Sequence, residues 1–136
     1  MIHHETTKRV RYGETDQMGY LYYGHYALYY EIGRVELLRS LGYTYAALEA
    51  EEGVMMPVLS LQCRFVRPAR YDTLVTIRTE LRRAPDRDIT FHYELTDARG
   101  KLLNGGSTRL CFVRVSDGAR VACPPPLARV VLPYFG

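Results

Sequence analysis

The chain has 136 residues, of which 47% are hydrophobic and 24% charged, and its formal net charge is +3. This length suits one domain, residues 1–136, and the composition excludes intrinsic disorder. Basic residues are scattered rather than clustered, which argues against a nucleic-acid partner. The sequence has neither an apolar run long enough to cross a bilayer nor the apolar segment of a secretory signal. We therefore expect a soluble, cytoplasmic protein without membrane insertion.

The sequence carries no recognisable metal or redox motif. Cys63, Cys111 and Cys123 show neither the even count of a disulfide scaffold nor the spacing of a zinc site, so we expect free thiols in a reducing compartment. His3 and His4 have no partner cluster, so we expect no bound metal. Nothing in the sequence matches a phosphate-binding or dinucleotide-binding fingerprint, so we also expect no cofactor.

The chain begins with a predicted strand and a loop. The strand covers residues 6–12 and places Val10 and Tyr12 on one side. Residues 13–19 form a turn-rich segment bounded by two glycines. This loop leads directly into the part of the chain that predicts helices.

Two helices are predicted next. Residues 23–41 repeat apolar side chains at helical spacing and are followed by Gly42, which supplies a stop. Residues 44–52 predict a short second helix with Thr44 as its cap. The expected buried stripe of the long helix comprises Leu28, Ile32, Val35 and Leu38.

The rest of the chain predicts four strands in hairpin order. The third alternates strictly between apolar and polar residues, and the fourth is apolar on both faces near its end, which favours a central position in the sheet. The prolines at 124–126 are expected to end the sheet. The four strands cover residues 58–65, 74–81, 89–95 and 102–115.

This order of elements indicates an α+β protein with a mostly antiparallel sheet. Gly33 lies in the middle of the long helix, where a glycine costs about 1 kcal/mol relative to alanine unless close packing requires it. A curved sheet wrapped round one long central helix would require it. We therefore expect the hotdog fold.

The segment between residues 12 and 30 holds seven of the twelve tyrosines and one aspartate of special interest. Asp16 lies in the glycine-bounded loop, close enough to the helix start for its carboxylate to face the first free N–H groups. A carboxylate beside fixed donors is half of an acyl-transfer site. Capping of the loop or the helix by the same side chain is an equally good interpretation of the spacing.

A recognisable pattern is formed by Tyr12-x-x-Thr-Asp16-x-x-Gly19-x-x-Tyr22, Tyr26, Tyr30-Glu31-x-x-Arg34-x-Glu36, Phe65-Val-Arg-Pro68-Ala69-x-Tyr71-Asp72, Gly105-Gly-Ser-Thr108 and Pro124. This pattern resembles the 4-hydroxybenzoyl-CoA thioesterase family of hotdog acyl-CoA hydrolases, and the resemblance covers nearly the whole chain. It implies that Asp16 is the catalytic carboxylate, acting as nucleophile or as general base. It also implies that the backbone N–H of Tyr23 polarises the thioester carbonyl. The Tol–Pal-associated acyl-CoA thioesterases have histidine at that position, so the side-chain chemistry differs here.

Other residues acquire candidate roles from the same resemblance. Tyr12 assists catalysis or packs the loop, and His25 contributes to the site or is a polar group at the helix start. Glu31 reaches the pocket floor or pairs with Arg34 one turn further along the helix. The expected apolar pocket residues are Met18 and Leu59, together with Met55 and Met56. The expected CoA phosphate ligands are Arg67, Arg82, Arg83 and Arg87, with Arg70 as an alternative to Arg67.

The sequence thus predicts an acyl-CoA thioesterase that needs no metal or cofactor, with an acyl-carrier-protein thioester as another possible substrate. A hotdog protein that binds such thioesters without hydrolysing them is the alternative. A hydratase would need a catalytic histidine, for which His25 is the candidate. An exposed sheet edge favours a homodimer or homotetramer, and the resemblance implies an active site at the subunit interface.

Overall fold

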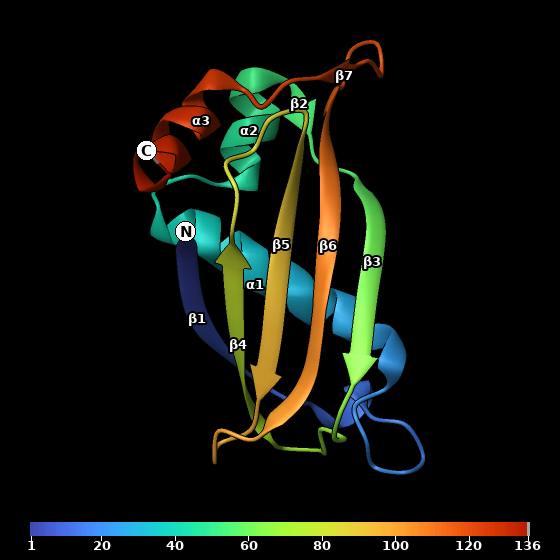
Figure 1. Ribbon diagram of the computed structural model, residues 1–136. Helices are drawn as coiled ribbons and strands as arrows, with labels where there is room; N and C mark the ends of the chain where they lie inside the picture. Colours follow the sequence, from blue (N-terminus) through green and yellow to red (C-terminus); the bar gives the residue numbers. More distant parts are fainter. Residues whose placement is uncertain (136) are drawn as a thin grey trace.

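A computed structural model describes residues 1–135, and its sheet and central helix form the expected hotdog fold (Figure 1). The strands pair antiparallel in the order β1-β4-β5-β6, and β6 also pairs with β3, β2 and β7. The strands are β1 (Ile2–Arg9), β2 (Val54–Met55), β3 (Val58–Phe65), β4 (Leu74–Leu81), β5 (Asp88–Thr96), β6 (Leu102–Arg114) and β7 (Arg120–Val121). The helices are α1 (Tyr26–Ser40), α2 (Tyr45–Glu52) and α3 (Pro125–Val131), with short 3-10 turns η1 (Tyr12–Glu14), η2 (Tyr23–His25) and η3 (Leu132–Tyr134).

Helix α1 crosses one face of the sheet and contacts β1, β4 and β5. The long helix is confirmed, and so is the close approach predicted from Gly33. A Cβ at position 33 would overlap the Thr79 hydroxyl oxygen and lie 2.8 Å from Cγ2 of Ile77 on β4. The glycine therefore lets the helix backbone pack directly on the strand.

The predicted buried stripe of this helix is confirmed only in part, with Ile32 packing against the core from a partly covered position. Leu38 is buried, whereas Leu28 is exposed and Ile32 and Val35 are only partly covered. Tyrosines occupy the inner face instead, because their hydroxyls find polar partners there: Tyr29 donates to Glu14, and Tyr30 donates to Asn104. The buried face comprises Tyr26, Tyr29, Tyr30, Gly33, Arg34, Leu37 and Leu38.

The first strand also differs from its prediction. It covers Ile2–Arg9 rather than residues 6–12, and Val10 and Tyr12 do not share a side. Val10 is fully buried and its N–H donates to Thr73 O (2.9 Å), whereas Tyr12 is 79% exposed. The strand ends early because the chain turns into η1, so strand alternation no longer applies at Tyr12.

The later strands and the second helix agree with their predictions. Strands β3 and β4 have the predicted bounds, β5 is one residue longer at each end, and β6 is one residue shorter. Thr44 caps α2, since its Oγ1 accepts from the N–H of Ala47 (3.1 Å).

The C-terminal segment contains an element that the sequence did not predict. The prolines at 124–126 follow the sheet as expected, but they also begin α3, with Pro124 as its N-cap. Leu127 and Val131 of this helix are fully buried in the core. The two-residue strands β2 and β7 were not predicted either.

Candidate active site

Asp16 lies in a tight loop whose backbone it helps to hold. Its Oδ1 accepts from the N–H groups of Met18 (2.9 Å) and Tyr20 (3.2 Å), and its own N–H donates to Tyr20 O (2.8 Å). Gly19 completes the turn with a φ of +79°, which glycine adopts at little cost. Within residues 1–135 no donor bonds to Oδ2 of Asp16. The carboxylate therefore caps the loop through one oxygen and leaves the other free.

A cavity of about 360 Å³ lies between this loop, the start of the central helix and the segment that follows β3. Its wall is mainly aromatic and aliphatic, with one carboxylate and one guanidinium. Phe65 contacts Tyr26 edge-on, with 5.1 Å between the ring centroids, so the end of β3 and α1 form one continuous wall. The lining residues are Asp16, Met18, Tyr20, Leu21, Tyr23, Tyr26, Phe65, Val66, Arg67 and Pro68.

The N-terminal end of the helix faces the same cavity through Tyr23. Here the 3-10 turn η2 runs directly into α1, and the N–H of His25 donates to Tyr22 O (2.9 Å). The N–H groups of Tyr23 and Gly24 make no hydrogen bond within residues 1–135. Such groups at a helix start favour negative charge. Asp16 and Tyr23, the two principal predicted catalytic residues, therefore line one cavity.

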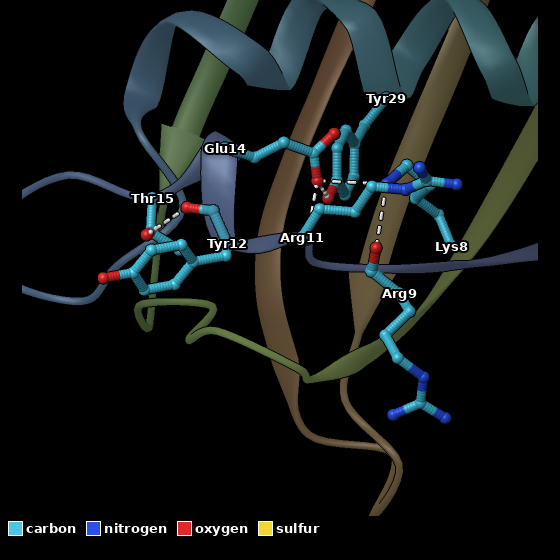
Figure 2. Close-up of polar contacts among 7 residues, drawn as sticks. All are labelled: Lys8, Arg9, Arg11, Tyr12, Glu14, Thr15 and Tyr29. Carbon is cyan, nitrogen blue, oxygen red and sulfur yellow. Dashed lines mark hydrogen bonds and ion pairs between the residues drawn. The ribbon is translucent and has the colours of Figure 1, made fainter.

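Tyr12 and His25 do not line this cavity. The Tyr12 ring packs edge-on against Tyr71, with 5.5 Å between centroids, and Figure 2 shows it pointing away from Glu14. His25 is half-buried and its ring lies edge-on to Tyr22 at 5.9 Å. Their participation in catalysis stays a prediction.

The predicted substrate-binding residues are only partly brought together. Met18 lines the cavity, whereas Leu59 is exposed on β3 and does not line it. Glu31 is exposed and does not line the cavity, and the ion pair with Arg34, its alternative role, is not formed. The Arg34 side chain is buried instead, and its Nε donates to the hydroxyl of Tyr45 (2.9 Å). Of the two further methionines, Met55 is exposed and Met56 is buried.

The predicted phosphate-binding arginines separate into two groups. Arg67 lines the cavity and donates to Leu102 O (3.0 Å). Arg82, Arg83 and Arg87 lie in or beside the β4–β5 turn, at the opposite end of the sheet from the Asp16 loop (Figure 1). One chain therefore does not bring all four to the cavity. The alternative, Arg70, lies over the ring of Tyr20 with 4.9 Å to its centroid.

A carboxylate that the sequence analysis missed, Glu14, lies just before Asp16. Its Oε1 accepts from Lys8, from the backbone N–H of Arg11 and from the hydroxyl of Tyr29 (Figure 2). Burial alone would raise the pKa of this carboxyl, but these hydrogen bonds more than offset it and hold the pKa below its usual range. Burial, together with the hydrogen bond to Glu14, raises the pKa of Tyr29 far above its usual range. The acidic residue three positions after Arg11 was the one available sequence signal.

Neither a metal cluster nor a membrane span is found in the described chain. Within residues 1–135, no three His, Cys, Asp or Glu side chains lie close enough together to hold an ion. No helix in that range is both long and apolar enough to cross a bilayer.

Comparison with known proteins identifies the class to which this fold and cavity belong. Residues 10–131 match the Thioesterase-like superfamily, and the chain belongs to it. It is 30% identical over 108 residues to "Putative acyl-CoA thioesterase YneP" of Bacillus subtilis, covering 79% of this chain and 78% of that protein. It is 33% identical over 96 residues to "Acyl-CoA thioester hydrolase YbgC" of Escherichia coli O6:H1, covering 71% of each.

Solved structures agree with this assignment. The DHNA-CoA thioesterase of Staphylococcus aureus superposes with a TM-score of 0.86 at 28% identity, covering 98% of this chain and 87% of that one. A mutant 4-hydroxybenzoyl CoA thioesterase, solved in complex with 4-hydroxybenzoyl CoA, gives a TM-score of 0.84 at 18% identity, covering 96% and 99%; at this identity it supports the fold alone. The chain is a thioester hydrolase, and the family resemblance seen in the sequence is confirmed.

Proposed function

We propose that this enzyme hydrolyses an acyl-CoA thioester to a free acid and CoA, with Asp16 as the catalytic carboxylate. The observation that carries the proposal is that Asp16 and Tyr23 line one cavity, and that within residues 1–135 Oδ2 of Asp16 and the N–H of Tyr23 make no hydrogen bond. The relatives named acyl-CoA thioesterases support the substrate class.

Two routes use these groups. As a nucleophile, the carboxylate attacks the thioester carbonyl and expels the CoA thiolate, and water then hydrolyses the mixed anhydride. As a general base, it removes a proton from the water that attacks the carbonyl, and the thiolate leaves. In both routes the Tyr23 N–H donates to the carbonyl oxygen as negative charge develops on it.

The Asp16→Asn variant tests the proposal in a thiol-release assay over short, long and aromatic acyl-CoAs. We expect kcat to fall by about 10²–10⁴-fold, the usual contribution of a positioned acid or base. Asp97→Asn is the matched control, because Asp97 Oδ1 likewise accepts from two backbone N–H groups of its own loop, at Arg99 and Lys101. Thermal unfolding of both variants checks that the fold is kept.

Unchanged hydrolysis by Asp16→Asn would refute this mechanism. The assay also separates the non-catalytic alternative: binding of acyl-CoA by the wild type without thiol release would favour a carrier or sensor. Adding an acyl-carrier-protein thioester to the panel shows which carrier the enzyme accepts.

We also propose that the enzyme works as a homodimer, alone or paired into a tetramer. Within residues 1–135, strand β3 pairs only with β6, on one side, and its apolar side chains are exposed. Leu61 and Phe65 share, by strand alternation, the face that carries the Tyr26–Phe65 contact, and Leu59 is exposed at the register shift between Val58 and Ser60. A second copy that pairs antiparallel with this edge satisfies the free backbone groups and covers that face. An interface of this kind supports the expectation of a site shared between subunits.

Antiparallel pairing of β3 with β3 of a second copy would decide which chain supplies each of the arginines expected to bind CoA. The two-fold axis places the β4–β5 turn of a second copy at the same end of the extended sheet as the Asp16 loop of the first. We propose that Arg67 contacts CoA from the chain that supplies Asp16, whereas Arg82, Arg83 and Arg87 reach its phosphates from the second copy. Leu59 of the second copy approaches the acyl end in the same arrangement.

A further inference from the structure

Glu14 links the loop that carries Asp16 to two rigid elements of the fold. It ends the η1 turn, and its side chain is only 14% exposed. One oxygen, Oε1, accepts from Nζ of Lys8 (3.0 Å), the N–H of Arg11 (2.9 Å) and the hydroxyl of Tyr29 (2.9 Å) (Figure 2). Lys8 belongs to β1 and Tyr29 to α1, so the carboxylate joins a sheet edge to the central helix.

The donors to Glu14 are themselves held in place. The Tyr29 side chain is fully buried, and Nζ of Lys8 lies 5.2 Å from the centroid of its ring. Nζ of Lys8 also donates to Arg9 O (2.8 Å). A charged carboxylate that accepts from fixed donors forms bonds that are shorter and stronger than neutral ones. These hydrogen bonds therefore hold the Glu14 carboxylate firmly in one position.

The backbone around Glu14 connects this fixed carboxylate to both parts of the candidate active site, the Asp16 loop and the segment that contains Tyr23. Its carbonyl oxygen accepts from the N–H of Tyr22 (2.9 Å), next to Tyr23. Two residues further along, the N–H of Asp16 donates to Tyr20 O (2.8 Å). A displacement of residue 14 would thus change the distance between the Asp16 carboxylate and the Tyr23 N–H.

We propose that Glu14 is a positioning residue of this thioester hydrolase, which sets the separation of Asp16 and the Tyr23 N–H; the inference rests on the function proposed for those two groups. Glu14 does not line the cavity, so it acts through the loop. Within residues 11–25, no other side chain hydrogen-bonds to both β1 and α1.

Kinetics of the Glu14→Ala variant test the proposal. We expect kcat to fall by about 100-fold, because small displacements of reacting groups have effects of that order, with KM changed by about twofold or less. Glu14→Gln should recover most of the loss, since its amide oxygen still accepts from Arg11 and Tyr29. Should Glu14→Ala fail to fold, Tyr29→Phe removes a single donor and should lower kcat in the same direction.

Thr44→Ala controls for a purely structural effect. It removes the cap of α2 and lowers stability far from the cavity, so its kcat should stay at the wild-type value. If Glu14→Ala loses stability as Thr44→Ala does but keeps wild-type kcat, the positioning role is wrong.

Amide hydrogen exchange gives a readout that does not depend on turnover. In Glu14→Ala the N–H groups of Asp16 and Tyr22 should exchange about tenfold faster, the effect of losing roughly one hydrogen bond, whereas in Thr44→Ala they should not. Unchanged exchange would overturn the proposal. Full activity of Asp16→Asn, by contrast, would overturn the proposed function and leave the exchange result to decide whether Glu14 holds the loop.

Discussion

At position 33, a glycine in the middle of α1 lies directly against Ile77 and Thr79 of β4. In an exposed helix, replacing glycine by alanine would stabilise the chain by about 1 kcal/mol. Here the added methyl overpacks the contact, so we expect Gly33→Ala to lower the free energy of unfolding by about 1–3 kcal/mol in urea titrations. Gly13→Ala, which adds its methyl to open space, should change it by less than about 0.5 kcal/mol. A stabilised Gly33→Ala would contradict the packing described.

The stability of the protein should also depend on pH through the Glu14 carboxylate. The pKa of Glu14 in the folded protein lies below its ordinary value of 4.5. Its contribution to stability is therefore fully present above pH 4.5 and is lost as the pH falls through the folded-state pKa. We expect Glu14→Gln to destabilise the protein by about 1 kcal/mol near neutral pH, because the amide still accepts hydrogen bonds but without the extra strength that the charge gives them.

Urea unfolding of the two proteins over a pH series measures this difference. It should shrink steadily below pH 4.5, and Glu49→Gln, which alters an exposed carboxylate on α2, should show no such trend. If the difference in free energy of unfolding were the same at every pH, the charge of Glu14 would contribute nothing to stability.

The role of Asp16 could be predicted from the sequence, whereas that of Glu14 could not, and the reason is physical. The loop position of Asp16 followed from two glycines and from its distance to the helix start, which are local features. Glu14 escaped notice because its partners Lys8 and Tyr29 lie on separate elements, six and fifteen residues away in sequence. Only the packing of β1 beside α1 reveals that it is a shared acceptor.

Among the long strands, β3 has the most exposed residues. We expect sedimentation equilibrium to show a dimer or tetramer of the 15.7 kDa chain. Leu61→Lys places a charge on the exposed edge and should yield monomers with much lower thioesterase activity, since the shared site is lost. Leu132→Lys, on η3, alters a leucine of similar exposure and should remain oligomeric and active. A monomeric wild type with full activity would refute the shared site.

The helices show which features local sequence signals can predict and which they cannot. Thr44 and Gly53 bound α2 through local caps, and such signals are visible in sequence. Apolar spacing predicts α1 equally well but not its inner face, because tyrosines with hydrogen-bonded hydroxyls occupy that face where aliphatic residues were expected. The prolines at 124–126 predict an end to the sheet and give no sign of a further helix, yet α3 begins there because proline suits the first turn of a helix.

For the whole molecule, the arginines of the β4–β5 turn lie far from Asp16 within one chain. If a second copy supplies them, Arg82→Ala and Arg83→Ala should each raise KM for an acyl-CoA by about tenfold, roughly one charge-assisted hydrogen bond. KM for the matching acyl-pantetheine, which lacks the nucleotide phosphates, should not change. Arg129→Ala, on the exposed side of α3, is the control. Equal KM values for wild type and variants would remove these arginines from the CoA site.

Local chemistry was enough to define the strand-rich α+β layout, the central helix with its close-packed glycine, and the family resemblance centred on Asp16. Capping, turn geometry and side-chain periodicity act over a few residues, so they can be recognised in the chain itself. The inner face of α1, the anchoring of Glu14 and the separation of the arginines became evident only in three dimensions. Each depends on which distant elements pack together, and that is decided by burial of the whole core rather than by neighbours in sequence.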